Sequence, residues 1–216
     1  MRIAVLGTGP VGHAIASRLV GLGHDVWMGS RDAAGEKVLA WATGHSERAH
    51  PATFADAAAA AELLVNATGG VVSLDVLASI DPADLAGKVL LDVSNPLDFS
   101  NGFPPGLSPA VSDSAAEQLQ RAHPQLRVVK SLNTMNCDVM VDPSLVRGPH
   151  TVFVAGDDAE AKATVTDLLV SFGWPGPDIL DLGGLSASRG LEAYVLLWIN
   201  VRMALGTNVF NIAVVH

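Results

Sequence analysis

The chain has 216 residues and a net charge of −9 at neutral pH, from 13 Lys and Arg against 22 Asp and Glu. Hydrophobic residues make up 49% and charged residues 16%, which excludes a disordered chain because disorder combines low hydrophobicity with high charge. An acidic chain without a basic block is not expected to bind nucleic acid or an anionic membrane, because both need clustered Lys and Arg.

Short apolar runs alternate with segments of helical length along the chain. The runs that predict strands are Arg2–Leu6, Asp25–Met28, Glu62–Ala67, Lys88–Val93, Leu126–Leu132, Thr151–Ala155 and Asp178–Leu182. The segments that predict helices are Pro10–Leu22, Gly35–Ala42, Val71–Ile80, Ser114–Ala122, Ala159–Phe172 and Leu185–Leu205. Runs that are apolar throughout are typical of strands covered by helices on both faces. The alternation therefore predicts an α/β fold with a doubly wound parallel sheet.

Two stretches fall outside this alternation. Asn95–Asp113 is rich in Pro and Gly and predicts a long irregular loop, either a lid over a ligand or a plain surface excursion. Leu191–Val215 is very apolar, but Glu192 and Arg202 interrupt it. We therefore expect a buried helix or a subunit-interface helix there rather than a membrane span.

The composition also bears on assembly and compartment. So few charges on so apolar a chain predict a homodimer, in which a second subunit covers part of the surface. The single cysteine, Cys137, cannot form an internal disulfide, which fits a soluble protein of the cytoplasm.

A glycine-rich turn follows the first predicted strand and opens the first predicted helix, and it reads Gly7-Thr8-Gly9-Pro10-Val11-Gly12. With a second strand at Asp25–Met28, it has the context of a dinucleotide-binding turn. Gly7 permits the tight turn, Gly9 leaves room for a pyrophosphate, and Gly12 lets helix and strand pack closely. The free N–H groups and the dipole of the helix N-terminus favour such an anion.

The glycine-rich turn refines the fold prediction to a Rossmann sheet. Residues 1–183 form the predicted Rossmann domain, and residues 184–216 form a small, mainly helical C-terminal lobe for a substrate cleft or dimer interface.

The end of the second strand predicts which dinucleotide binds. NAD sites usually carry Asp or Glu there, but this chain has Ser30 and Arg31. Arg31 can bind a 2′-phosphate and stack on adenine, and Ser30 can donate a further hydrogen bond. The predicted cofactor is therefore NADP(H). Lys37 is a weaker phosphate candidate, and Asp32 is expected to cap the next helix.

Three later strand ends carry small or neutral polar residues that suit a nicotinamide and its ribose, namely Asn66-Ala67-Thr68-Gly69-Gly70, Ser94-Asn95-Pro96 and Asn133-Thr134-Met135-Asn136. Ligands of such sheets lie outside the carboxyl ends of the strands. Ordinary turn chemistry explains each group taken alone. Their recurrence at successive strand ends predicts cofactor contacts from these groups, with Asn95 among the contacting residues.

No catalytic side chain stands out. Tyr194 is followed four residues later by Trp198, so a Tyr-x-x-x-Lys proton donor is missing. His45 and His50 lie in a polar loop without a third ligand, so no metal site is expected. Lys130, at a strand end, is interpreted as a solvated lysine. Cys137 is interpreted as a small buried residue rather than a nucleophile.

Several segments resemble the NADP oxidoreductases that depend on the deazaflavin coenzyme F420. They are Met1–Gly9, Leu22–Val26, Gly29–Arg31, Val128–Thr134, Val154–Asp158 and Leu182–Arg189. The dinucleotide-binding domain of the membrane ferric reductases called STEAP is similar. The resemblance covers nearly the whole chain and implies hydride transfer between NADPH and F420, with the two rings stacked in a narrow cleft.

The resemblance also implies roles for individual residues. Phosphate contacts fall to Thr8, Gly9, Pro10, Val11, Ser30 and Arg31, and Ala67 and Thr68 flank the nicotinamide. Asn133 and Met135 would lie beside the second ring. Archaeal members carry a histidine where Asn133 stands, which leaves open a wider pocket or another acceptor.

Two other functions remain open. One is an NADPH-dependent reductase of a small carbonyl or imine, with Asp138, Tyr194 or Lys130 as the proton donor. The other is a non-catalytic NADP-binding redox sensor. Hydride transfer between stacked rings needs no such donor, because proximity and alignment supply about 7–11 kcal/mol of the barrier.

Overall fold

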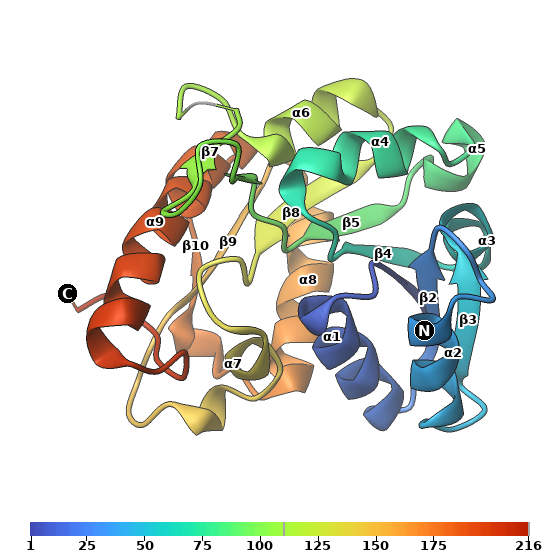
Figure 1. Cartoon of the computed structure of the whole chain (residues 1–216), viewed down its shortest axis with the longest axis horizontal. Helices are drawn as coiled ribbons and strands as arrows, with labels where there is room; N and C mark the ends of the chain where they lie inside the picture. Colours follow the sequence, from blue (N-terminus) through green and yellow to red (C-terminus); the bar gives the residue numbers. More distant parts are fainter. Residues whose placement is uncertain (110, 216) are drawn as a thin grey trace.

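The computed structural model describes residues 1–109 and 111–215, and an eight-stranded sheet forms its centre (Figure 1). The strands lie in the order β10-β9-β8-β5-β4-β1-β2-β3. Their bounds are β1 Arg2–Leu6, β2 Asp25–Ser30, β3 Ala49–Thr53, β4 Leu63–Asn66, β5 Val89–Asp92, β8 Arg127–Ser131, β9 Val152–Gly156 and β10 Ile179–Asp181. The strand order reverses between β1 and β4, and ligands of doubly wound sheets bind at the carboxyl end of such a point.

The prediction of a parallel sheet is confirmed for β3, β2, β1, β4, β5 and β8, which are neighbours in this order and run parallel. It is wrong for β9 and β10, which run opposite to these six strands. β9 pairs antiparallel with β8, and β10 pairs parallel with β9. For β9 to run parallel to β8, a crossover connection would have to carry the chain back along the length of β8 before β9 begins. Between β8 and β9 the chain holds only the short helices α7, Cys137–Val141, and η2, Pro143–Leu145, so β9 starts at the edge where β8 ends.

Helices cover both faces of the sheet, as predicted from the apolar strands. The remaining helices are α1 Pro10–Gly21, α2 Glu36–Thr43, α3 Phe54–Ala60, η1 Gly70–Val72, α4 Ser73–Ala78, α5 Pro82–Leu85, α6 Ala115–Ala122, α8 Ala159–Phe172, η3 Gly176–Asp178, η4 Leu185–Ala187 and α9 Ser188–Leu205. One core packs beneath α1, α2, α7 and α8, and the other beneath α3 to α6. On β1, Ile3 and Val5 join the first core and Ala4 and Leu6 the second. Figure 1 shows α4, α5 and α6 on one side of the sheet and α1, α7 and α8 on the other.

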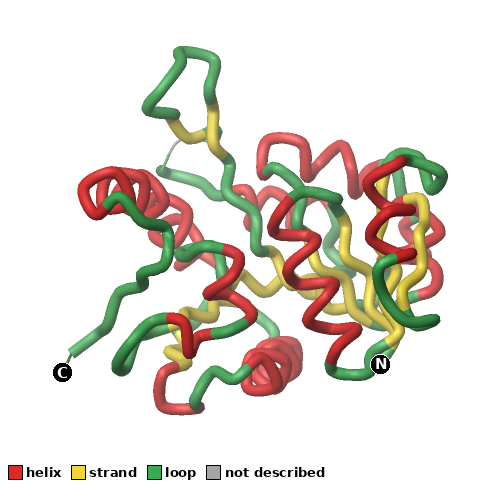
Figure 2. The backbone as a smooth tube through the Cα atoms, turned by 60° about the horizontal axis from the view of Figure 1, so that its bottom comes forward, coloured by secondary structure: helices red, strands yellow, loops and turns green. Residues whose placement is uncertain are grey.

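Two predicted irregular regions contain strands. His50, expected in a polar loop, lies on β3, the edge strand beside β2. The polar sequence hid this strand, and Pro51 is tolerated because an edge strand has one unpaired side. The predicted loop Asn95–Asp113 includes a two-stranded hairpin, β6 Leu97–Asp98 and β7 Gly106–Leu107. Figure 2 shows the hairpin projecting from the rest of the chain; Ala110, in the same loop, lies outside the described residues.

The predicted C-terminal helix Leu185–Leu205 is divided into η4 and α9. The tail that follows α9 returns to the start of β9, where Thr151 N–H donates to Ile212 O at 2.8 Å and Val214 N–H donates to Thr151 Oγ1 at 3.1 Å. Within the described part of the chain, no helix combines the length and apolarity that crossing a membrane requires.

Candidate functional site

The turn between β1 and α1 has the backbone geometry that its glycines predict. Gly7 has φ +124°, and a Cβ there would lie 2.6 Å from Ala67 O. A Cβ on Gly12 would clash with the carbonyl oxygen of Gly7. A Cβ on Gly9, in contrast, would meet no atom of the described residues within 4 Å. The fold itself therefore requires Gly7 and Gly12, whereas the space beside Gly9 is open to a ligand.

The N-terminus of α1 can receive an anion. Gly9 is its N-cap and Pro10 its first residue, and the first turn holds no acidic residue. Among the described residues, no side chain caps these N–H groups. Unpaired N–H groups and the positive end of the helix dipole together attract a phosphate. This end of α1 thus fits the pyrophosphate of a dinucleotide.

A cavity of about 650 Å³ lies over this turn, within the size range of cofactor sites. It is lined by Gly7, Thr8, Gly9, Arg31, Phe54, Ala67, Thr68, Gly69, Val72, Asp75, Val76 and Ser79. A second cavity, of about 370 Å³, shares Thr8, Arg31 and Phe54 with it and adds Ser30 and Lys37. The structure therefore brings four of the predicted phosphate residues together with Ala67 and Thr68, namely Thr8, Gly9, Ser30 and Arg31. Pro10 and Val11 line neither cavity, and their phosphate contacts stay a prediction.

Three apolar lining residues, Phe54, Val72 and Val76, were not predicted from the sequence. Phe54 follows β3, which itself was missed. Val72 is 46% exposed although it is large and apolar. In the sequence Val72 is only the second of two valines that follow Gly69-Gly70, and its exposure at the cavity wall appears only in the folded chain.

The end of β2 carries one cation, Arg31, that forms no ion pair within the described part of the chain. Ser30 Oγ donates to Asp32 O at 2.6 Å, and Asp32 Oδ1 accepts from Ala34 N–H at 2.9 Å. The expected capping of the next helix by Asp32 is wrong, because its carboxylate closes this turn and Gly35 is the N-cap of α2. Arg31 is exposed and makes no ion pair with any described residue. Its guanidinium is free to bind an anion in either cavity.

The end of β4 is held by buried hydrogen bonds. Asn66 Nδ2 donates to Ser73 Oγ at 2.9 Å and to Asp92 Oδ1 at 2.8 Å. Asn66 Oδ1 accepts from Thr68 Oγ1 at 2.6 Å. Because the Ala67 carbonyl also packs against Gly7, the Ala67–Thr68 turn has one fixed position at the cavity wall.

The predicted contacts Asn95 and Asn133 pair with each other. Asn133 Nδ2 donates to Asn95 Oδ1 at 2.9 Å and to Leu191 O at 2.9 Å, and Asn95 Nδ2 donates to Asn133 O at 2.8 Å. Asn133 is buried, and Met135 is buried in the core beside α7. None of the three residues lines the two cavities over the glycine-rich turn. Their side chains fasten the start of α9 and fill the core, and their contacts with a ligand stay a prediction.

The three alternative proton donors differ in their surroundings. The interpretation of Lys130 as a solvated lysine is wrong, because its side chain is fully buried. Its Nζ donates to Asp92 at 2.7 Å, to Ser94 O at 2.6 Å and to Glu192 at 3.0 Å. Burial would lower the pKa of Lys130, but the two carboxylates raise it above its usual value. All three of its protons are bound within the protein, so Lys130 is unsuited to donate one to a substrate.

Tyr194 and Asp138 are not paired with buried charges as Lys130 is within the described residues. The Tyr194 hydroxyl is buried without a hydrogen-bond partner among the described residues, and burial raises its pKa. Asp138 is exposed in the first turn of α7. Cys137 is half-buried, and burial raises the pKa of its thiol, so the unreactive protonated form dominates at neutral pH.

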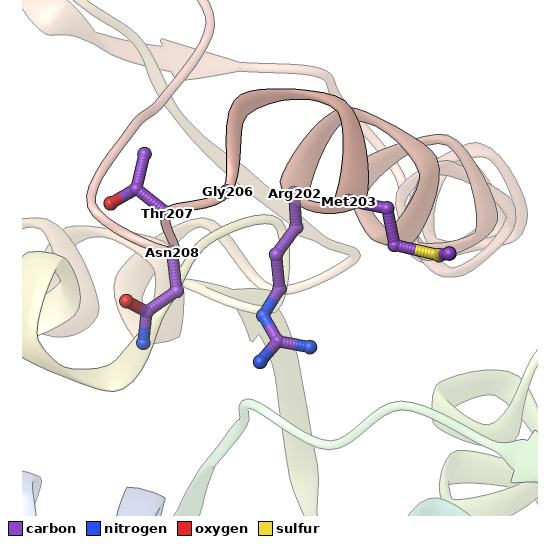
Figure 3. Close-up of a pocket in the computed structure, with 5 residues that line it drawn as sticks. All are labelled: Arg202, Met203, Gly206, Thr207 and Asn208. Carbon is purple, nitrogen blue, oxygen red and sulfur yellow. The ribbon is translucent and has the colours of Figure 1, made fainter.

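A separate cavity of about 340 Å³ lies at the C-terminal end of α9. Arg202, Met203, Gly206, Thr207 and Asn208 line it, and Figure 3 shows the Arg202 side chain extending away from the helix. The cavity shares no residue with the two cavities over the glycine-rich turn.

Comparisons with known proteins agree with this geometry. A family described as NADP oxidoreductase, coenzyme F420-dependent, matches residues 2–96. The F420-dependent NADP reductase of Methanothermobacter marburgensis is 32% identical over 94% of this chain and 93% of its own length. Metalloreductase STEAP3 of Rattus norvegicus is 31% identical over 90% of this chain but only 36% of its own length.

Two solved structures are similar as well. A protein of Arthrobacter sp. FB24, provisionally described as an F420-dependent NADP-reductase, is 48% identical, with a TM-score of 0.94 and full coverage of both chains. A reductive aminase from Aspergillus terreus is 21% identical, with a TM-score of 0.64 over 95% of this chain and 62% of its own. At that identity the likeness concerns the fold alone.

Proposed function

Because the chain belongs to the family of coenzyme F420-dependent NADP oxidoreductases, we propose that it transfers hydride between NADPH and F420 or a similar planar acceptor. One observation carries the cofactor part of this proposal. The N-terminus of α1, the unpaired Arg31 and the Ala67–Thr68 turn all border one cavity of about 650 Å³. We place the pyrophosphate at α1, the 2′-phosphate at Arg31 and the nicotinamide at Thr68.

The residues of the site act by binding and orientation. Gly9 lets the backbone approach the pyrophosphate, and Arg31 binds the 2′-phosphate with Ser30 and Lys37 beside it. Bound NADPH supplies the hydride. The Ala67–Thr68 turn orients the ring from which it leaves, and orientation of two stacked rings supplies about 7–11 kcal/mol of the barrier. The Lys130 ammonium donates its three hydrogen bonds to groups of the protein itself, which supports a mechanism in which no lysine donates a proton to the substrate.

The proposal is tested by mixing the protein with NADPH and oxidised F420 and following the loss of deazaflavin absorbance, with NADH as the matched control. We expect rapid bleaching with NADPH and slow or no bleaching with NADH. Tight NADPH binding without bleaching would contradict F420 as the acceptor. Carbonyl or imine reduction that falls in Tyr194→Phe or Asp138→Asn would then identify the small-substrate reductase, and turnover of no acceptor would identify the redox sensor.

We further propose that the protein is a homodimer of a reducing compartment such as the cytoplasm. The exposed side of α9 supports the dimer, because Leu197, Met203 and Leu205 are 57%, 61% and 58% exposed. The free thiol of Cys137 is compatible with a reducing compartment.

A further inference from the structure

A continuous chain of hydrogen bonds, partly buried at Thr68 and buried beyond it, crosses the carboxyl end of the sheet. Thr68 Oγ1 donates to Asn66 Oδ1 at 2.6 Å, and Asn66 Nδ2 donates to Asp92 Oδ1 at 2.8 Å. Lys130 Nζ then donates to Asp92 Oδ2 at 2.7 Å and to Glu192 Oε1 at 3.0 Å. The chain thus joins the turn at the cofactor cavity to helix α9.

The sheet register creates this chain. Asn66 on β4 is the Cα partner of Asp92 on β5, and Asp92 is the partner of Lys130 on β8. The three side chains therefore stand side by side in one row across three parallel strands, and none of them is exposed to solvent. Burying two carboxylates and an ammonium is costly unless every group is paired, so the row favours one arrangement.

The direction of each hydrogen bond in the chain is fixed. The Lys130 ammonium can only donate, and Asp92 Oδ2 therefore accepts. Asp92 Oδ1 accepts from Asn66 Nδ2 and from Ser94 N–H at 3.2 Å. This turns the amide oxygen of Asn66 toward Thr68, where it accepts from the hydroxyl and from the backbone N–H at 3.3 Å. The charge of Asp92 thereby sets the polarity of the Thr68 contact.

The other end of the chain fastens α9. The Glu192 carboxylate accepts from the N–H groups of Ala115 at 2.9 Å and Ala116 at 3.2 Å, at the start of α6. The Asn133 amide holds Leu191 O one residue earlier on α9. The N-terminal half of α9 is thus attached to the same row of residues that orients Thr68.

We propose that Asp92 and Lys130 are positioning residues that hold the Ala67–Thr68 turn, the seat of the nicotinamide, in a fixed register with α9. This inference rests on the proposed function for the NADPH site but not on the identity of the acceptor. Neither residue borders the cavity, so both act through Asn66 and Thr68.

Asp92→Asn is the variant that separates this role from simple stability. An amide at position 92 must turn its NH₂ either toward the Lys130 ammonium or toward Asn66 Nδ2, and both arrangements put donors face to face. When the NH₂ faces Asn66, relief requires the Asn66 amide to flip. The flip removes the amide oxygen that accepts from the Thr68 hydroxyl and N–H, and Ser73 Oγ at 2.9 Å is then the remaining partner of the hydroxyl. Glu192→Gln is the matched control, because it removes a carboxylate from the same ammonium but touches α6 and α9 instead of Asn66.

The test compares the affinities of each variant for NADPH and for 2′,5′-ADP, which lacks the nicotinamide end. For Asp92→Asn we expect NADPH affinity to fall about tenfold while 2′,5′-ADP affinity stays within about twofold of the wild type. For Glu192→Gln we expect lower thermal stability with NADPH affinity largely retained. Equal losses for both ligands, or equal NADPH losses in the two variants, would overturn the proposal.

A double-mutant cycle checks the route of the effect. Thr68→Val removes the hydroxyl at the end of the chain, so adding Asp92→Asn to it should weaken NADPH binding little further, whereas additive losses would contradict coupling through Asn66. Should Asp92→Asn not fold, Thr68→Val compared with Thr68→Ser carries the test, and Ser must retain the affinity that Val loses. Failure of the wild type to bleach F420 would refute the acceptor and leave these binding results intact.

Discussion

Arg31→Ala is the sharpest test of the cofactor assignment. Arg31 is exposed, has no ion pair with a described residue and borders both cavities, so its removal should leave the fold intact. A hydrogen bond to a charged group contributes about 1.5–3 kcal/mol, and a guanidinium can offer a phosphate two of them. Solvent weakens this exposed contact, and Lys37 and Ser30 remain beside it. We therefore expect a net loss of about 2 kcal/mol, or about thirtyfold in NADPH affinity.

The assay is a fluorescence titration of NADPH and NADH at low and moderate salt. NADPH binding should weaken about thirtyfold in Arg31→Ala and less in Arg31→Lys, while NADH binding changes little because it lacks the 2′-phosphate. Arg48→Ala is a matched control, since Arg48 is a surface arginine that pairs with Asp25 outside both cavities. Unchanged NADPH affinity in Arg31→Ala would refute the phosphate assignment.

Three further predictions address the turn, the pH dependence of stability and the assembly. Gly9→Ala should leave the melting temperature unchanged and weaken NADPH binding at least tenfold, because its Cβ would enter only the space meant for the ligand. Gly12→Ala should lower the melting temperature, because its Cβ would clash with the Gly7 carbonyl. The reverse pattern would contradict the cavity assignment. Hydrogen bonds from Arg121 lower the pKa of Asp113 to about 2, below its value of about 3.9 in an unfolded chain. The stabilisation is therefore complete above about pH 4 and is lost as the pH falls toward 2. In urea unfolding, Asp113→Asn should be less stable than the wild type at pH 6, and this difference in stability should become small near pH 2. Equal stability of the two proteins at both pH values would show that the Asp113–Arg121 pair contributes nothing. Leu197→Glu should convert the proposed dimer to a monomer in light scattering, and a wild type that is monomeric at micromolar concentration would refute the dimer.

The glycine-rich turn could be predicted because its requirements are local. Gly7 and Gly12 are needed by a strand, a turn and a helix that follow one another within a few residues. The same holds for Ser30, which ends β2, and for Arg31, which follows it. Their place at the end of this strand puts both at the wall of the smaller cavity. A motif whose required contacts all lie within a short stretch of chain can be recognised from the sequence without knowledge of the rest of the fold.

The environment of Lys130 could not be predicted in the same way. In sequence it is a charged residue near the end of an apolar strand, and solvent is the usual surrounding of such a side chain. Its partners Asp92 and Glu192 lie 38 and 62 positions away, and only the pairing of β5 with β8 and the packing of α9 bring them within 3.0 Å. The side-chain direction of Asn133, toward Leu191 rather than into a cavity, has the same origin.

The sequence by itself determined the doubly wound sheet, the glycine-rich turn between β1 and α1 and the choice of NADP over NAD, because alternating apolar runs and neighbouring residues carry that information. Only the tertiary structure decided the reversed direction of β9, the edge strand β3 and the buried row that links Thr68 to α9. Strand register and helix packing join residues that are far apart in the chain. A buried charge is stable only where such distant partners meet it, so its role becomes visible once the chain is folded.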